Sequence, residues 1–349
     1  SGLKHWGAVA GFLDGPARLR QAPADVITLY AAKGLTFPPG MQEDYSSIGY
    51  MVLGVVLEKV TGIAFDKLLQ NEIFGPLGLA STSVDDAVTI LPGRVRPYRY
   101  NFLKATYDNA EQRDPSTTWS TGGILSTVDD LLRWSEALST DAVLPDSLRE
   151  LIFDRNEGDA WYGWRVDTLA GEVRSFWHVG VETGFRSQIV RIPRRGQTIV
   201  VLGNIRDLDS DGITRRILTI LVGGTPDLPK RSIARAIYRA AAASGGDSAA
   251  ARFRALVRRP QEYDTSQVQA LIAAIELRSD KACDRAAPVY EAWLEVYPES
   301  RNRITALVGA ADCRLQLGED AKARTHIDRL AQIDPGNANL AELRRRLRQ

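Results

Sequence analysis

Hydrophobic and polar positions follow a helical period in the first part of the chain. Residues 48–61, IGYMVLGVVLEKVT, repeat apolar side chains at helical spacing. One face of this predicted helix gathers Ile48, Met51, Val52, Val55 and Val56. Gly62 follows as a stop signal, and residues 65–74 are predicted to form a second helix before the turn GPLGL.

Further along, the pattern changes from helix to strand. Ser126–Asp129 reads as a capping box, which predicts a helix in VDDLLRWSEAL. Short runs rich in β-branched and aromatic residues follow: WYGWRVDTL, EVRSFWHV, FRSQIVRI and TIVVLGN. Because turn residues such as Pro193–Gly196 separate these runs, we predict an antiparallel meander. A last helix near 211–222 ends at Gly223.

The pattern changes again in residues 231–349, which are rich in alanine and arginine and carry almost no strand signal. Two segments superimpose at an offset of 37 residues, which is the distance from Pro298 to Pro335. Each has small residues in its first helix and an alanine in its second: Ala273, Ala274 and Ala286 in one, Ala310, Ala311 and Ala323 in the other. The segments resemble tetratricopeptide repeats, with an unrelated bundle of helical hairpins as the alternative.

The two cysteines, Cys283 and Cys313, fall on helices of successive repeats. We expect two buried thiols rather than a disulfide. Neither cysteine belongs to a C-x-x-C pair, which argues against zinc and thioredoxin-like chemistry.

Composition sets wide limits on function. The 349 residues suffice for about two domains, and 44% hydrophobic with 25% charged residues is ordinary for a globular protein. A net charge of +1 gives no global field that would favour nucleic acid or an anionic membrane. No apolar run is long enough for a membrane span, and the first residues lack the layout of a signal peptide.

One candidate for chemistry is the stretch Asp44–Tyr50, DYSSIGY, which follows the turn FPPG. Tyr45 precedes the predicted helix, and Ser46 or Ser47 is a natural N-cap. A phenol at this point faces the positive end of the helix dipole, which favours the anion. Beside a cation such a phenol can act as a base. Taken alone, the stretch is more often a core tyrosine with an ordinary cap.

A second candidate is Trp177–Gly180, WHVG, followed by ETGFRS. A strand with His178 and a nearby glycine suits a substrate that lies along the sheet edge as an added strand. Gly180 permits close approach, and the next N–H, of Val181, could bind an oxyanion. A lone histidine in a strand is usually structural or simply exposed.

In their order along the chain, these stretches resemble the serine β-lactamase and penicillin-binding-protein superfamily, and within it the class C-like esterases and D-alanyl carboxypeptidases. The matching segments are SGL at 1–3, PPG at 38–40, YSSIGYMVLGVVLEKVTG at 45–62, GPLGLAST at 75–82, TGGILSTVDDL at 121–131, HVG at 178–180 and TGFRSQIVRIPRRGQTIVVLGN at 183–204. The resemblance implies an α+β fold, an antiparallel sheet with flanking helices, incomplete at its N-terminus. It implies a hydrolase domain over 1–226, with an all-α tetratricopeptide-like domain over 227–349.

The resemblance also assigns roles. Tyr45 takes the place of the tyrosine that, with a lysine, deprotonates the nucleophilic serine and passes a proton to the leaving group. Ser47 replaces the family's asparagine, which binds the substrate amide, so an ester becomes more plausible. His178 stands where the family has lysine or histidine and would bind a substrate carboxylate. Val181 would supply one oxyanion N–H. No metal or other cofactor is implied.

The family's nucleophile is an S-x-x-K serine, and Ser1–Lys4 is the single such sequence in the chain. Ser1–Leu3, however, aligns with a later turn of the family, and Gly2 disfavours a helix start. We therefore expect the true nucleophile upstream of residue 1, an inactive chain as given, an exposed apolar face and an unpaired strand edge.

Two functions stay open. The first is a serine hydrolase acting on an ester or a D-alanyl peptide, exported or periplasmic as most of the family is. The second is a non-catalytic relative whose helical repeats bind a peptide or protein partner. Neither requires nucleic acid or a membrane span.

Overall fold

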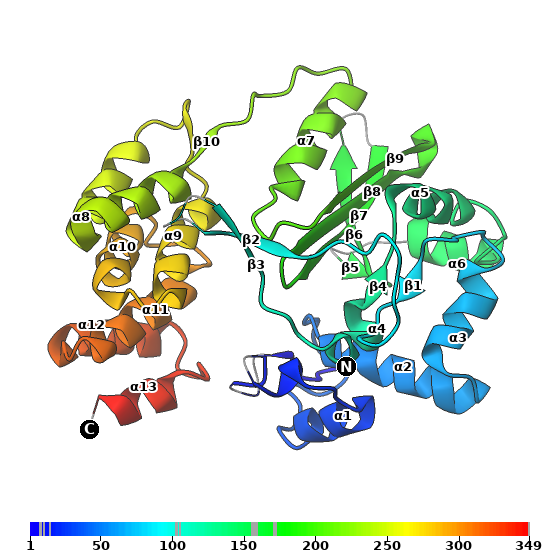
Figure 1. Cartoon of the computed structure of the whole chain (residues 1–349), viewed down its shortest axis with the longest axis horizontal. Helices are drawn as coiled ribbons and strands as arrows, with labels where there is room; N and C mark the ends of the chain where they lie inside the picture. Colours follow the sequence, from blue (N-terminus) through cyan, green and yellow to red (C-terminus); the bar gives the residue numbers. More distant parts are fainter. Residues whose placement is uncertain are drawn as a thin grey trace. The chain divides into compact units, whose positions relative to one another are not determined.

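The computed structural model describes the whole chain except residues 7, 8, 10, 14, 102, 103, 105, 155–159, 170–172 and 348–349. The chain divides into two compact units (Figure 1). Unit 1 comprises Ser1–Tyr100 and Tyr107–Asp227, and unit 2 comprises Asn101–Thr106 and Leu228–Gln349. Unit 1 carries the sheet and unit 2 is mainly helical.

The helices of unit 1 are α1 (Pro23–Ala31), α2 (Ser47–Thr61), α3 (Phe65–Leu69), α4 (Trp119–Gly122), α5 (Val128–Ala137), α6 (Asp146–Arg149) and α7 (Ser210–Leu221). Short 3₁₀ or π turns are η2 (Pro16–Arg18), η3 (Gln70–Phe74), η4 (Pro115–Thr117), η5 (Glu150–Asp154) and η6 (Pro193–Arg195). The predicted helix ending at Gly62 is confirmed, because α2 stops where Gly62 takes a φ of +69°.

The predicted antiparallel meander is also confirmed. Its strands are β5 (Ala160–Trp161), β6 (Trp164–Leu169), β7 (Val173–Glu182), β8 (Phe185–Ile192) and β9 (Gln197–Gly203). They form one sheet in the order β5-β6-β7-β8-β9, with every neighbouring pair antiparallel. Two small pairs lie outside this sheet: β1 (Ser83–Val84) with β4 (Ile124–Leu125), and β2 (Tyr98–Asn101) with β3 (Thr106–Asn109), whose Asn101 and Thr106 are assigned to unit 2.

A buried arginine joins the sheet to α5. Arg191 of β8 donates from Nε to Ser135 Oγ (2.8 Å) and from Nη2 to Ser139 Oγ (2.8 Å). Its guanidinium also lies 4.9 Å from the ring centre of Phe153, which packs with Leu138 and Phe176. Burial lowers the pKa of Arg191 to about 10, so the group stays charged at neutral pH and anchors α5 to the sheet.

The N-cap of α5 lies one residue later than the sequence predicts. Thr127, not Ser126, is the N-cap, and its side chain accepts a hydrogen bond from the amide of Asp130 (3.3 Å). Ser126 Oγ is instead hydrogen-bonded to Thr82 Oγ1 (2.8 Å). The Ser126 hydroxyl, which the sequence pattern predicts as the cap, thus bonds to Thr82 and does not cap the helix.

The predicted exposed apolar face lies on α2. Ile48 and Met51 are buried, whereas an opposite strip is open to solvent. The strip consists of Tyr50, Leu53, Val56, Leu57 and Val60, of which Val60 is 79% exposed. Val56, which the sequence pattern placed on the face of Ile48 and Met51, is instead 47% exposed because it lies at the margin of that face. The predicted free strand edge is present as well: no described strand pairs with the outer side of β9 within residues 197–203, although Tyr98 of β2 bridges to Ile205 just beyond the strand.

Unit 2 is built from α8 (Ile233–Leu256), α9 (Gln267–Ser279), α10 (Cys283–Val296), α11 (Arg303–Gln316), α12 (Asp320–Ile333) and α13 (Leu340–Arg346), with the parallel pair β10 (Arg231–Ser232) and β11 (Tyr263–Asp264). Gly245, with a φ of +82°, interrupts α8. α10 and α12 begin 37 residues apart, at Cys283 and Asp320, which matches the offset seen in the sequence. The tetratricopeptide identity of these hairpins stays a prediction.

Small residues allow the helices of unit 2 to approach closely. The six alanines singled out in the sequence, Ala273, Ala274, Ala286, Ala310, Ala311 and Ala323, are all fully buried. A Cβ atom at Gly309 of α11 would lie 2.4 Å from Tyr290 Cζ of α10. Any larger residue at position 309 would therefore push the tyrosine ring away.

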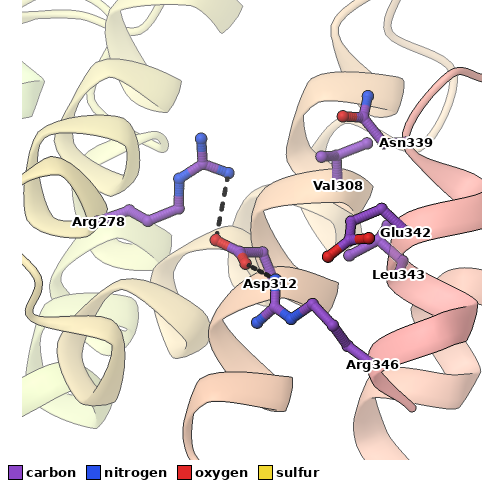
Figure 2. A pocket seen from close by; sticks show the side chains of 7 residues that line it. All are labelled: Arg278, Val308, Asp312, Asn339, Glu342, Leu343 and Arg346. Atoms are coloured by element: carbon purple, nitrogen blue, oxygen red, sulfur yellow. Dashed lines mark hydrogen bonds and ion pairs between the residues drawn. The ribbon is translucent and has the colours of Figure 1, made fainter. Parts of the chain in front are cut away.

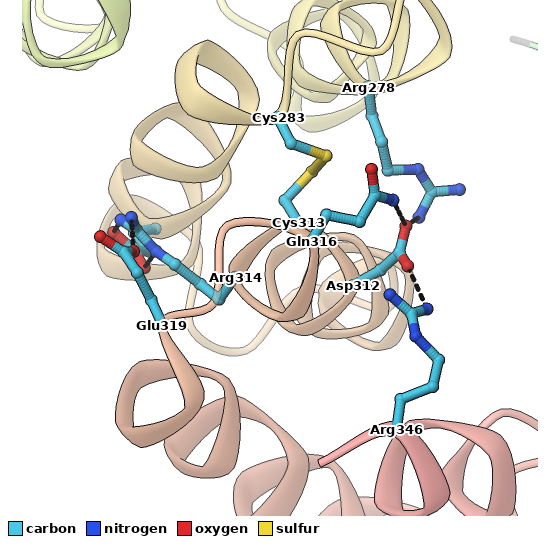
Figure 3. The surroundings of a disulfide bond; sticks show 9 residues. Arg278, Cys283, Asp312, Cys313, Arg314, Gln316, Glu319 and Arg346 are labelled. Carbon is cyan, nitrogen blue, oxygen red and sulfur yellow. Dashed lines mark hydrogen bonds and ion pairs between the residues drawn. A yellow bond between two sulfur atoms is a disulfide. The ribbon is translucent and has the colours of Figure 1, made fainter. Parts of the chain in front are cut away.

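The expectation of two free thiols is wrong. Cys283, the first residue of α10, is joined to Cys313 of α11 by a disulfide (Figure 3), and the two Cα atoms are 4.8 Å apart. That separation lies within the normal range for a disulfide. The physical reason is the register of the two helices, which places the start of α10 opposite the last turn of α11.

A polar network lies on the same helices. Arg314 donates from Nε to Glu291 Oε1 (2.8 Å) and pairs with Glu319, and His326 Nε2 lies 3.1 Å from the same Glu291 oxygen. Burial acts to raise the pKa of Glu291, but hydrogen bonds from His326 and Arg314 outweigh it and lower the pKa to about 2. The network therefore holds α10, α11 and α12 together at neutral pH.

The disulfide predicts a redox-dependent stability. It closes a loop of 30 residues, so reduction should lower the free energy of unfolding of unit 2 by about 3–4 kcal/mol through added entropy of the unfolded chain. Urea denaturation with and without reductant measures the difference. The Cys283→Ser/Cys313→Ser double variant is the control and should not respond to reductant. Two free thiols in the denatured, unreduced chain would contradict the prediction.

Candidate active site

The first site residues lie at the start of α2. Tyr45 precedes the helix by two residues and is 56% exposed. Ser46 is the N-cap, and its side chain accepts a hydrogen bond from the amide of Gly49 (3.1 Å). Ser47 is the first helical residue and is 6% exposed. The phenol of Tyr45 therefore stands at the positive end of α2, whereas the Ser47 side chain is buried.

His5 belongs to this site, and the sequence analysis missed it. The amide N–H of Ser47 donates to His5 Nδ1 (3.4 Å). The His5 ring meets the ring of Tyr45 edge to face, with centroids 5.2 Å apart. Burial lowers the pKa of His5, and the nearby Asp44 carboxylate partly opposes this. The only signal in the sequence was the histidine directly after SGLK, which read as part of a loop.

Tyr50, in the first turn of α2, lies close to Tyr45. Burial raises its pKa, and the neighbouring Tyr45 adds to the effect. A Cβ atom at Gly163, in the turn between β5 and β6, would lie 3.3 Å from Tyr50 Oη. The β5–β6 turn thus contacts the first turn of α2, which ties the tyrosine end of the site to the sheet.

Ser1–Lys4 does not form the helical turn that a serine–lysine pair requires. Residues 1–5 have no regular structure, and Gly2 has a φ of +75°. Ser1 Oγ accepts a hydrogen bond from the amide of Leu3 (3.4 Å), and the amide of Thr36 donates to Gly2 O (2.8 Å). The predicted loop is confirmed, with its backbone held against residues 36–37.

The remaining predicted residues lie on β7. His178 pairs with Ile189 and Gly180 with Ser187, and Val181 is exposed. Pairing with β6 extends only as far as Trp177, so among the described strands residues 178–182 pair with β8 alone. Burial lowers the pKa of His178, Arg165 lowers it further and a hydrogen bond with Val179 opposes them. A neutral imidazole thus lies on an open strand edge.

Two glycines shape the end of this edge. A Cβ atom at Gly180 would lie 2.2 Å from Ser187 Oγ. At Gly184, in the turn to β8 with a φ of +75°, a Cβ atom would lie 2.5 Å from Pro97 Cβ and 2.6 Å from Ala110 Cβ. Gly184 therefore lets the β7–β8 turn pack against Pro97 and Ala110.

The structure thus forms two groups from the predicted residues. Tyr45 and Ser47 lie together at α2, and His178, Gly180 and Val181 follow one another on β7. Within the part of the chain that the structure describes, no hydrogen bond or ion pair joins the two groups. Their connection runs through Tyr50 and the β5–β6 turn at Gly163.

The described residues also form a cavity in each of the two units. In unit 2 a cavity of about 180 Å³ is lined by residues of α9, α11 and α13 and by Asn339 (Figure 2). Within it Asp312 lies between two arginines, 2.6 Å from Arg346 Nη1 and 3.9 Å from Arg278 Nη1. In unit 1 a second cavity of about 570 Å³ is lined by Arg20, Glu58 and Trp119 among others. Neither includes a predicted site residue.

The described residues contain no group of three or more His, Cys, Asp or Glu side chains that could hold a metal ion. No single helix among the described residues has both the length and the apolar character needed to cross a membrane. The pair formed by Ser47–Thr61 and Phe65–Phe74 reaches both only with a bend of 80°.

The antiparallel sheet and its flanking helices are those of a β-lactamase/transpeptidase-like fold. The family model described as Beta-lactamase matches residues 1–223. This chain therefore belongs to the β-lactamase family.

Individual relatives agree with this assignment. Penicillin-binding protein 4* of Bacillus subtilis is 25% identical over 229 residues, which are 59% of this chain and 50% of that protein. D-aminopeptidase of Gluconobacter oxydans is 25% identical over 207 residues, 57% of this chain and 38% of that protein. A penicillin binding protein from Bacillus halodurans superimposes with a TM-score of 0.56 at 19% identity, covering 63% of this chain and 69% of that one. The chain thus spans about half or less of the two curated relatives.

The turn at Gly184 offers a test of the site's framework. Gly184→Ala should lower the free energy of unfolding of unit 1 by about 3 kcal/mol, because the methyl group clashes and the backbone is left-handed. Gly196→Ala is the matched control, since Gly196 has a φ of +59° but no atom within 4 Å of its Cβ position. It should cost about 1 kcal/mol. Equal losses in chemical denaturation would contradict the close packing.

Proposed function

We propose that unit 1 is the scaffold of a serine hydrolase that works through an acyl-serine intermediate. The observation that carries the proposal is the placement of Tyr45 at the positive end of α2, while His178–Val181 lie on an open edge of β7. The β5–β6 turn, which contacts Tyr50, links the two places. Family membership over residues 1–223 supports this reading.

In the proposed reaction, Tyr45 accepts the proton of the attacking serine hydroxyl with help from a lysine. The serine oxygen then forms a bond to the substrate carbonyl carbon, and the bond to the leaving group breaks. Tyr45 returns the proton to the leaving group. The N–H of Val181 stabilises the oxyanion. Water then gives a proton to Tyr45 and its oxygen bonds to the acyl carbon; the bond from that carbon to the serine oxygen breaks, and Tyr45 returns the proton to the serine.

The proposed substrate is an ester or a D-alanyl-type peptide. Relatives include a D-aminopeptidase and penicillin-binding proteins. His178 would bind the substrate carboxylate less strongly than a lysine would, because its imidazole is neutral. Ser47 is buried and must expose its hydroxyl before it can bind an amide. The point about Ser47 favours an ester over an amide, and the point about His178 argues against efficient β-lactam hydrolysis.

The proposed reaction also requires a nucleophilic serine and its lysine. Ser1–Lys4 is the single S-x-x-K sequence in the chain, and its backbone is not helical. We therefore propose that the serine and lysine come from polypeptide other than these 349 residues, which alone turn over no substrate. The exposed apolar strip of α2 is consistent with a further segment packing there. The disulfide of unit 2 fits a proposed exported location.

A second candidate function belongs to unit 2, which would bind a peptide or protein partner. The observation that favours it is the cavity between α9, α11 and α13. There two arginines flank one carboxylate, and the side chains of Val308 and Leu343 are apolar (Figure 2). An extended peptide with both apolar and polar side chains would suit this lining.

Covalent labelling tests the first function. A fluorophosphonate should label the full-length gene product, and Tyr45→Phe should slow labelling by about 10²- to 10⁴-fold because the proton acceptor is lost. Tyr107→Phe is the control, since Tyr107 is similarly exposed on β3, and its labelling rate should not change. These 349 residues alone should not be labelled. An unlabelled but folded full-length protein, or an unaffected Tyr45→Phe variant, would exclude the mechanism.

A further inference from the structure

His5 makes two contacts at the start of α2, both with residues 40 or more positions away in sequence. Its Nδ1 accepts the amide N–H of Ser47 (3.4 Å), and its ring lies edge to face with Tyr45, with centroids 5.2 Å apart. Among the described residues, this is the one ring–ring contact that Tyr45 makes. Tyr45 is 56% exposed, and the other tyrosine near it is Tyr50, whose pKa it helps to raise.

The backbone that precedes His5 is held by two hydrogen bonds. Ser46 Oγ donates to Lys4 O (3.4 Å), and the amide of Thr36 donates to Gly2 O (2.8 Å). Gly2 is required for this path, because a Cβ atom there would lie 2.2 Å from Phe37 O. His5 is thus presented to Tyr45 by a segment that is itself anchored.

The hydrogen bond from Ser47 determines the state of the imidazole. Nδ1 must carry a lone pair in order to accept, so the ring proton resides on Nε2. A protonated ring would turn an N–H toward the Ser47 N–H and add a positive charge at the positive end of α2. The charged and titratable groups that face His5 are the Asp44 carboxylate and the Tyr45 phenol.

We propose that His5 is a positioning residue for Tyr45: its neutral ring, held by the Ser47 amide, sets the orientation of the phenol at the start of α2. The catalytic value of this contact rests on the proposed role of Tyr45. The contact itself is independent of catalysis. It should be complete at pH 8 and be lost on acidification, as the imidazole gains its second proton at a pH below the usual 6.5 for histidine.

Nuclear magnetic resonance on these 349 residues tests the proposal. The probes are ¹³C-labelled tyrosine rings, with the Tyr45 signal assigned by Tyr45→Phe, and ¹⁵N-labelled histidine. In the unchanged chain at pH 8, His5 should show the Nε2–H tautomer. The Tyr45 signal should move toward the position of free tyrosine as the pH falls and His5 titrates.

Three variants separate positioning from a general structural role. His5→Ala should move the Tyr45 signal to the free-tyrosine position at every pH. His5→Asn keeps an acceptor for the Ser47 N–H but removes the ring, so the helix start should persist while the Tyr45 signal moves as in His5→Ala and shows no acid transition. His326→Gln, in unit 2, is the matched control and should leave the Tyr45 signal unchanged.

The proposal fails if Tyr45 keeps its signal and its acid transition in a folded His5→Ala variant, or if His5 is the Nδ1–H tautomer. If His5→Ala does not fold, the His5→Asn variant decides, because persistence of the acid transition in it would also exclude His5. Since these signals do not depend on turnover, a failure of the hydrolase mechanism would leave them unchanged and would be recognised by labelling alone.

Discussion

The candidate site depends on how the first N–H groups of α2, which have no acceptor within the helix, are hydrogen-bonded. A helix leaves its first amides without partners, and here Ser46 satisfies that of Gly49 while His5 satisfies that of Ser47. These two hydrogen bonds fix the helix start. They also bring residues 1–5 over it and place Tyr45 beside an imidazole. The chemistry proposed for Tyr45 follows from a helix cap built by side chains from two distant segments.

The sheet carries the second group of candidate site residues, on β7. β7 is longer than its pairing with β6, so its last residues present the open edge at which we propose that the substrate binds. Gly184 allows the turn beyond that edge to pack on Pro97 and Ala110. Unit 2 is stabilised differently, by alanine packing, a disulfide and the Glu291–Arg314 ion pair. Its cavity is a separate feature with its own proposed role.

Local signals allowed much of this fold to be predicted from the sequence. The limits of α2 were readable because a serine cap and Gly62 lie at its ends, and the meander was readable from alternating strands and turns. The cap of α5 was misplaced because Ser126 and Thr127 are equally good by pattern, and only the contact with Thr82 decides between them. The disulfide depends on the register of α10 against α11, and His5 on a contact across 42 residues. No local pattern encodes either.

The central claim is that α2 and β7 belong to an acyl-serine hydrolase whose nucleophile is not Ser1. The most direct measurement is to acylate the full-length gene product with a fluorophosphonate, digest it and locate the modified residue by mass spectrometry. The account predicts a modified serine followed three positions later by lysine, in a peptide outside these 349 residues. Modification of Ser1, or of a serine elsewhere in these 349 residues, would contradict it.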